Sequence, residues 1–378
     1  MRKFLLSLVL LVIFCGISSA DIVYTTEDGN LGLIRIYRNL SFDLPVVENS
    51  IAGSNPIVGA YRGDKEARVF LVDRTLDKTT SGDTLYVFET TNLVEPINSG
   101  DLDGIYNVDK AVFSNNGNSV FLLSGLVIYD YSTETLTERN SFDFELQTSN
   151  DIYVTEIKGI AVDDAIYVIA DTVLSDDVLM QFDGQLKKDN RSFAIIESVE
   201  GTSDIAILSD TRLAVAHKGG VSQYRNGSFV TVVSSDYPVE KLCRDNDNGF
   251  FYITQRKSGN NYISTLSRYS ERRATFSSLT LEGRNPNIQL VRDSNYETLA
   301  VIMDEKIMLY DMSTGLLIED FDRYELGGVP LHMAACRADD SSGTKNSSSS
   351  GCEISLSGII LLLVCAGMIA KHKKTAQI

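Results

Sequence analysis

The chain has 378 residues, with 51 acidic and 34 basic side chains and a formal net charge of −17. Such an acidic surface repels nucleic acid and anionic lipid, which argues against a nucleic-acid-binding function. Apolar residues make up 43 % of the composition, enough to build a core, whereas five cysteines in this length do not make a disulfide scaffold.

The N-terminus has the pattern of a secretory signal peptide. Two basic residues precede an apolar run at 5–14, and Ser18-Ser19-Ala20 supplies small residues for cleavage. We therefore expect residues 1–20 to be removed on export. A lipoprotein signal that uses Cys15 is the alternative, but Phe14 is bulky where such a signal needs a small residue.

Strand patterns follow the signal peptide. Three short strands are predicted at 22–25, 33–37 and 44–47. Beyond them, runs of β-branched and apolar residues, such as 69–72 and 166–169, alternate with turns rich in Asp, Asn, Gly and Ser. Because no long stretch shows a period of 3.6 residues, the pattern predicts an all-β domain.

The strands recur as a unit in which one strand ends in a polar turn and a more apolar strand follows. The last position of the first strand recurs at intervals of 36 to 51 residues, at Arg62, Phe113, Val162, Leu208, Arg244, Arg292 and Arg337. A four-stranded propeller blade takes about 40–50 residues, so seven such positions predict a seven-bladed β-propeller. A β-sandwich array is the alternative.

The ends of the repeat predict how the ring closes. Three strands precede the first unit, near residue 56, and no second strand follows the last unit. One blade is therefore expected to combine the N-terminal strands with a C-terminal strand at 331–336, which lies innermost. This pairing leaves no free sheet edge.

A membrane segment is predicted after the propeller, which spans residues 21–340. A serine-rich linker at 341–352 leads to a helix predicted within 353–370, where Ile354–Ala370 carries no charge over 17 residues. The basic tail at 371–378 resists translocation, so the chain is expected to be a single-pass membrane protein with its N-terminus outside. Without the signal peptide, the membrane segment and the tail, 29 basic and 50 acidic residues remain, a net charge of about −21.

The sequence Ser347-Ser348-Ser349-Ser350-Gly351-Cys352, followed by the apolar segment and basic residues, resembles a bacterial tripartite sorting signal of the Synergist type. This resemblance implies an address for the cell surface that a membrane protease reads and cleaves. A plain membrane anchor is the alternative, and both place the propeller in the cell envelope or at the cell surface.

Two segments carry a family resemblance. Residues 113–121, Phe-Ser-Asn-Asn-Gly-Asn-Ser-Val-Phe, resemble the F-S-P-D-G-x-x-x-Y turn of YVTN and quinoprotein-like repeat propellers, and residues 307–315 resemble their V-x-Y-D-x-x-T-G third strand. The resemblance implies the propeller fold. It does not select an activity, because that fold carries sensors, scaffolds, lactonases and redox enzymes.

The candidate binding site is a set of arginines in one register of the repeat. Arg62, Arg244, Arg292 and Arg337 occupy the end of the innermost strand in four blades that become consecutive once the ring closes. Four guanidinium groups near one channel mouth can bind a carboxylate or phosphate through forked hydrogen bonds. The alternative is that they form ion pairs between blades, with acids such as Asp245.

Catalytic and metal-binding patterns are sparse. Only His217 and His332 precede the linker, both within predicted strands, and a structural role is expected for each. The segment Asp245-Asn246-Asp247-Asn248-Gly249 resembles a calcium loop, but Arg256 stands where a bidentate Glu is needed, so it is interpreted as a turn. No catalytic residue, metal ligand or cofactor is predicted, and use of a divalent cation is left open.

These features favour an exported binding or scaffold module for a protein, peptide or glycan, with a monomeric ectodomain held at the membrane by its C-terminal helix. The alternative is an extracytoplasmic, metal-dependent hydrolase of the lactonase type. The sequence favours the non-enzymatic function and does not identify a bacterial or a eukaryotic source.

Overall fold

The computed structural model describes residues 20–36, 43–50, 56–62, 67–74, 82–89, 92–114, 117–147, 153–162, 165–173, 177–183, 186, 196–199, 201–209, 212–225, 228–245, 249–270, 278–283, 289–293, 298–311 and 314–335. All of them belong to one compact unit, Ala20–Ser342. The signal peptide apart from Ala20, the linker at 341–352, the segment at 353–370 and the tail at 371–378 lie outside the described residues. Within the described residues, no helix has the length and apolarity that a membrane span requires.

The described residues form seven four-stranded antiparallel sheets. The blade that joins the two ends of the domain contains, from the innermost strand outward, β28 (Pro330–Ala335), β1 (Ala20–Thr26), β2 (Asn30–Ile36) and β3 (Val46–Ser50). The next three blades are β4 (Ile57–Arg62), β5 (Ala67–Asp73), β6 (Thr84–Glu89) and β7 (Asn98–Asp101); β8 (Lys110–Phe113), β9 (Ser119–Ser124), β10 (Val127–Ser132) and β11 (Glu138–Asp143); and β12 (Val154–Val162), β13 (Ala165–Thr172), β14 (Asp177–Asp183) and β15 (Ile196–Val199).

The remaining three blades repeat this order along the chain. They are β16 (Thr202–Ser209), β17 (Arg212–His217), β18 (Gly220–Arg225) and β19 (Ser228–Ser234); β20 (Val239–Arg244), β21 (Phe250–Ser258), β22 (Asn261–Tyr269) and β23 (Leu279–Gly283); and β24 (Gln289–Asp293), β25 (Thr298–Met303), β26 (Lys306–Asp311) and β27 (Leu317–Asp322). Two one-turn helices, α2 (Phe144–Gln147) and α3 (Arg323–Leu326), follow outermost strands.

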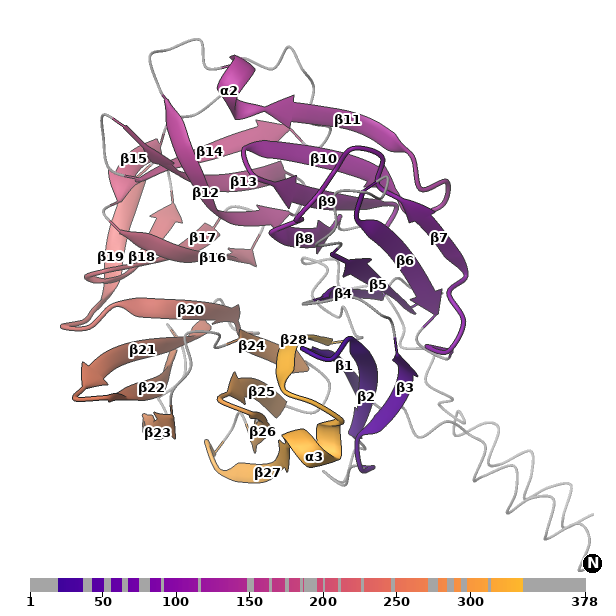
Figure 1. Ribbon diagram of the computed structural model, residues 1–378. Coiled ribbons are helices and arrows are strands. Elements are labelled where there is room, and N and C mark those ends of the chain that lie inside the picture. Colours follow the sequence, from indigo (N-terminus) through magenta and orange to yellow (C-terminus); the bar gives the residue numbers. More distant parts are fainter. Residues whose placement is uncertain are drawn as a thin grey trace, which may run out of the picture. The chain divides into compact units, whose positions relative to one another are not determined.

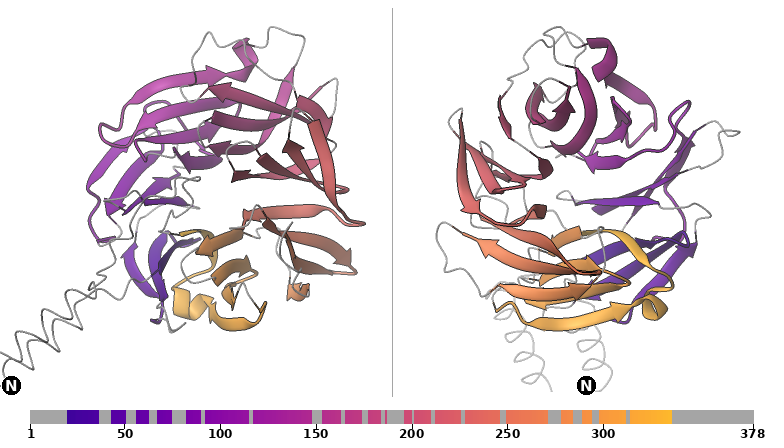
Figure 2. Two further views of the ribbon diagram at one scale, coloured as in Figure 1. Left: turned by 180° about the vertical axis from the view of Figure 1, so that it is seen from behind. Right: turned by 60° about the vertical axis from the view of Figure 1, so that its left-hand side comes forward.

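The sheets close into a ring. Each first strand contacts the first strand of the next blade in the order β28, β4, β8, β12, β16, β20 and β24, and β24 contacts β28 again. Figures 1 and 2 show the sheets radiating from a centre that these strands face. The predicted seven-bladed propeller is therefore confirmed, and the β-sandwich alternative is wrong.

The predicted closure is confirmed as well. Strand β28 pairs with β1 from Ile22 opposite Ala335 to Thr26 opposite Pro330, so the C-terminal strand lies innermost and the N-terminal strands complete its blade. The segment at 113–121 starts at the last residue of β8 and ends within β9, and that at 307–315 begins in β26, the third strand of its blade.

Hydrophobic packing between blades holds the ring together. The described buried side chains form seven clusters, and each cluster draws its members from two neighbouring blades. Between the β8 and β12 blades, the rings of Phe142, Phe144 and Phe182 pack edge to face with centroids 4.8 to 5.8 Å apart. Successive side chains of a strand point to opposite faces of its sheet, so each sheet packs against a different neighbouring blade on each face.

Candidate functional site

The structure describes the backbone of three of the four predicted arginines and the side chain of one. Arg62 ends β4, Arg244 ends β20 and Arg292 is the fourth residue of β24, while Arg337 lies outside the described residues. The Arg244 side chain is half-buried, and those of Arg62 and Arg292 are not described. All three lie at or next to the end of an innermost strand, and the anion site itself stays a prediction.

In the other three blades, the residue at or next to the end of the innermost strand packs between blades. Phe113 and Leu208 are buried in the clusters between neighbouring blades, and Val162 packs against such a cluster from a half-buried position. The position therefore tolerates an apolar side chain that packs between neighbouring blades.

Asp245 is one of the acids that the ion-pair alternative offers to the arginines, and it is the first residue of the calcium-like segment. Its carboxylate pairs with Arg268 of β22, with Nε 2.7 Å and Nη2 2.5 Å from Oδ2. Both side chains are buried, and the guanidinium carbon lies 5.4 Å from the centroid of the Phe251 ring. The Asp245 N–H donates to Gly249 O at 2.9 Å, which closes a turn as predicted.

The ring of His217 is held by hydrogen bonds within its own blade. Gly219 N donates to its Nδ1 at 3.2 Å, which assigns the remaining ring proton to Nε2, 3.0 Å from Ser222 Oγ. Burial lowers the pKa of His217, and the neutral ring is favoured. Because Nε2 donates in this tautomer, it is no base for the Ser222 hydroxyl.

Charged side chains converge instead at the opposite mouth, where the innermost strands begin. We call this end the entry mouth, and its ionisable groups near strand starts are Lys110 (β8), Glu156 (β12), Asp204 (β16), Lys241 (β20) and His332 (β28). Lys110 interacts electrostatically with Asp204, Lys241 and Glu156, although these groups belong to four different blades. The groups therefore lie close to one another across the channel.

β-Bulges precede two of these side chains in their strands and change the direction in which they point. The pairing shifts between Thr202 and Asp204 in β16, and between Val239 and Lys241 in β20. A bulge lets the strand turn one side chain away from the ladder and is common at barrel rims and functional sites. Asp204 is held in place because its Oδ2 accepts from Leu242 N at 2.9 Å.

The environment of the entry mouth changes the titration of two groups. Burial lowers the pKa of Lys110, an effect opposed by Asp204 and reinforced by Lys241. Burial lowers the pKa of His332 to about 4, and the positive charges of Arg74 and Lys241 act in the same direction. His332 is therefore neutral at pH 7, beside two cations.

A pH-dependent contribution to stability follows for His332. The unfolded chain takes up a proton near pH 6.5 and the folded chain only near pH 4, so acid favours unfolding between these values. Above pH 6.5, His332 is neutral in both states and costs no stability. As the pH falls from 6.5 to 4, protonation of the unfolded chain lowers the free energy of unfolding by up to about 3 kcal/mol.

We expect His332→Gln to remove this dependence. Chemical denaturation of both proteins at pH 7, 5.5 and 4 measures it, because glutamine does not titrate and the carboxylates titrate in both proteins. Stability curves of wild type and variant that stay parallel across this range would contradict the assignment.

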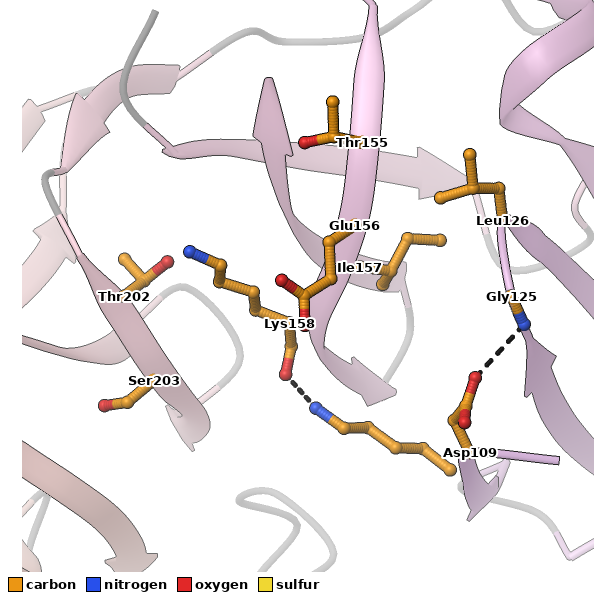
Figure 3. A pocket seen from close by; sticks show the side chains of 10 residues that line it. Asp109, Gly125, Leu126, Thr155, Glu156, Ile157, Lys158, Thr202 and Ser203 are labelled. Atoms are coloured by element: carbon orange, nitrogen blue, oxygen red, sulfur yellow. Dashed lines mark hydrogen bonds between the residues drawn. The ribbon is translucent and has the colours of Figure 1, made fainter. Parts of the chain in front are cut away.

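A hollow of about 500 Å³ opens at the entry mouth between β8, β12 and β16 (Figure 3). Its lining residues are Asp109, Lys110, Gly125, Leu126, Thr155, Glu156, Ile157, Lys158, Thr202 and Ser203. The volume is that of a small-ligand or side-chain site. We refer to it as the entry hollow.

Buried polar contacts form one wall of the entry hollow. Asp177 accepts hydrogen bonds at 2.5 Å from both N and Oγ1 of Thr202, and its Oδ1 lies 3.0 Å from Lys158 Nζ. The Lys110 ammonium donates to the carbonyl of Lys158. These contacts tie β8, β12, β14 and β16 together and give the wall a fixed shape.

The exposed side of the entry hollow carries carboxylate groups, which are hydrogen-bond acceptors. Glu156 and Asp109 are exposed, and Asp109 Oδ2 accepts from Gly125 N at 3.1 Å. Among the residues that the structure describes, no group of three or more His, Cys, Asp or Glu side chains is arranged to hold a metal ion. The arrangement suits recognition of a polar ligand by fixed charges and hydroxyl groups.

The sequence contains a further signal for this site. Glu156, Asp204 and Lys241 recur near strand starts at intervals of 48 and 37 residues, within the range of 36 to 51 residues found for the ends of the same strands. Aligning charges at the first strand's start, as well as its end, would have identified the entry mouth.

The chain is similar in structure to known propeller-like proteins. A functionally unknown protein from Desulfotomaculum acetoxidans DSM 771 matches with a TM-score of 0.61 and 12% identity, over 85% of this chain and 100% of the other. The apo AztD structure from Citrobacter koseri matches with a TM-score of 0.47 and 10% identity, over 84% of this chain and 98% of that one. No protein-family model and no curated protein matches the sequence, so similarity to known proteins identifies the fold alone.

Proposed function

We propose that the chain is an exported binding or scaffold propeller that recognises a protein, peptide or glycan through its entry mouth. The observation that carries this proposal is the convergence of charged side chains from several blades around the entry hollow. Recognition needs fixed groups on a rigid frame, and the inner strands supply that frame.

The sequence at the two chain ends supports the location. The signal-peptide pattern at 1–20 and the segment at 353–370 favour export to the cell envelope, with either a membrane anchor or a Synergist-type sorting signal. The resemblance to YVTN and quinoprotein-like propellers at 113–121 and 307–315 fits such a module. The ectodomain acts as a monomer in this proposal.

A blocking variant tests the binding face. Thr155 is exposed in the entry hollow, so Thr155→Arg fills the space with little effect on folding. Val230→Arg on the outermost strand β19 is the matched control, since it adds the same charge at an exposed position away from the hollow.

We expect the wild-type full chain and Val230→Arg to capture the same partner from envelope extract, and Thr155→Arg to lose it. Quantitative mass spectrometry after cross-linking measures the difference. Capture that is equal in all three proteins places binding elsewhere, and the repeated absence of any partner overturns the proposal. A stoichiometric divalent ion in the purified chain would favour the hydrolase alternative instead.

A further inference from the structure

Each blade ends in an outermost strand whose outer edge pairs with no other described strand. The backbone groups of such an edge can pair with a strand of another molecule, and a charged side chain on the edge opposes this pairing. Six of the seven outermost strands, β3, β7, β11, β15, β23 and β27, contain at least one acidic residue. These acids include Glu48, Asp101, Glu138, Glu197, Glu282 and Glu319.

Strand β19 is the exception. Its sequence, Ser-Phe-Val-Thr-Val-Val-Ser, contains no charged residue, and with 7 residues it is the longest of the seven outermost strands. Its central residues are of the β-branched and aromatic types that favour strands. Val230 is 44% exposed, Thr231 is exposed as well, and the strand lies on the outer margin of the ring (Figure 1). The edge of β19 is therefore open to pairing and lacks the charge that protects the others.

The inner contacts of β19 hold the strand in place. The ring centroids of Phe229 and Tyr224 lie 5.3 Å apart, and Val232 and Val233 pack against the cluster shared with the β20 blade. A bulge at Val232 interrupts the pairing with β18, whereas residues 228–231 pair in regular register. Because β3, β11 and β27 combine such a bulge with charge, β19 retains only one of two common devices against edge pairing.

The sequence of β19 is complementary to a second copy of itself. In antiparallel self-pairing about Thr231, serine lies opposite serine, valine opposite valine, and Phe229 opposite Val233. Apolar pairs and threonine pairs across strands are favourable, whereas like charges opposite each other are unfavourable. The same pairing of any other outermost strand brings carboxylates of two copies into one short contact, in a chain with a net charge of −17. Among the outermost strands, β19 is thus the one that fits an identical strand.

We propose that two copies of the chain pair through β19, antiparallel and about a two-fold axis. The two four-stranded sheets of this blade then join into one continuous sheet. The contact buries one strand edge of each copy, so it is small and reversible. Each copy keeps its own entry mouth, so a single ectodomain remains the recognising unit of the proposed function, and the pairing does not depend on that function.

Sedimentation velocity of the full chain in a nonionic detergent, over a range of concentrations, tests the pairing. We expect a monomer–dimer equilibrium for the wild type and at least about tenfold weaker association for Val230→Arg. The two-fold axis places this charge in the interface twice, without a partner. Val46→Arg is the matched control, since it makes the same change at a residue that is 49% exposed on the outermost strand β3. It should associate like the wild type.

The two variants also control for net charge. Both make the acidic chain less negative by one, so a general electrostatic effect would strengthen association in both. Added salt should tighten the wild-type dimer, because it screens the repulsion between two acidic copies. A wild type that stays monomeric at every concentration would overturn the inference, and so would equal association of all three proteins or open-ended assembly in place of a dimer.

Hydrogen exchange identifies the surface that pairs. The amides of residues 228–234 should exchange more slowly as the wild-type concentration rises, because new backbone hydrogen bonds protect them. The same amides in Val230→Arg should show no such dependence. A dimer whose formation leaves the exchange of β19 unchanged pairs through another surface and contradicts the proposal.

Val230→Arg serves in the capture experiment as well, so the outcomes separate this inference from the proposed function. If this variant captures the partner but does not dimerise, both proposals stand. If it loses the captured partner while the wild type is monomeric, β19 receives a strand of that partner and self-pairing is wrong. If none of the proteins captures a partner, the proposed function fails, and sedimentation still decides the role of β19.

Discussion

Replacing Arg268 with methionine is expected to lower the free energy of unfolding by about 3 to 5 kcal/mol, because the substitution leaves the Asp245 carboxylate buried without its partner. The side chains of the pair retain only 5% and 2% of their exposure, and the Arg268 guanidinium has further contact with the Phe251 ring. A charge isolated in this environment has no water to replace its lost ion pair.

Denaturant titration of three proteins measures the effect. Arg323→Met removes the exposed pair with Glu305, whose atoms lie 3.1 Å apart, and should cost less than about 1 kcal/mol. The double variant Arg268→Met with Asp245→Leu should regain part of the loss, since no isolated charge remains. A loss at Arg268 no greater than that at Arg323 would show that the pair contributes nothing beyond a surface contact.

The same pair explains why the turn after β20 was difficult to interpret from sequence. Alternating acids and amides at 245–249 match the composition of a calcium loop and of a tight turn equally well. The residue that decides is Arg268, 23 positions further along the chain. Only the antiparallel pairing of β20, β21 and β22 brings it to Asp245, and no local pattern contains that information.

The fold itself was accessible because its signals are local and repeated. Alternation along each strand, polar turns and a regular repeat length are all readable within one blade, and the closure follows from counting strands at the two ends. The structure accordingly places Arg62, Phe113 and Val162 at the ends of successive innermost strands, as the sequence predicted.

The entry mouth is hard to predict in full from the sequence because Lys110 does not share the repeat offset of the other charged residues. Lys110 is the first residue of β8, whereas Asp204 and Lys241 are the third residues of their strands and follow bulges. A bulge shifts the register by one residue, so equivalent positions in space stop being equivalent in sequence. Convergence across the channel, as between Lys110 and Lys241, also needs the closed ring.

Replacing Met333 with aspartate is expected to cost more than about 4 kcal/mol, the second large effect, because it introduces a charge into buried packing without a partner. Met333 is 5% exposed on β28, in the cluster that joins the β24 blade to the blade built from both ends of the domain. Met333 lies opposite Tyr24 in the pairing of β28 with β1.

Leu317→Asp is the matched control, since it makes the same chemical change on the outermost strand β27 at a residue that is 51% exposed. Denaturant titration should show a loss below about 1 kcal/mol for Leu317→Asp. Limited proteolysis should cleave Met333→Asp faster than either other protein, because loss of β28 leaves β1 as an unpaired edge and separates the two ends of the ring. Equal protease resistance in both variants would show that the ring holds without its closing strand. The pairing of β28 with β1 would then follow from the order of strands along the chain and would not contribute measurably to stability.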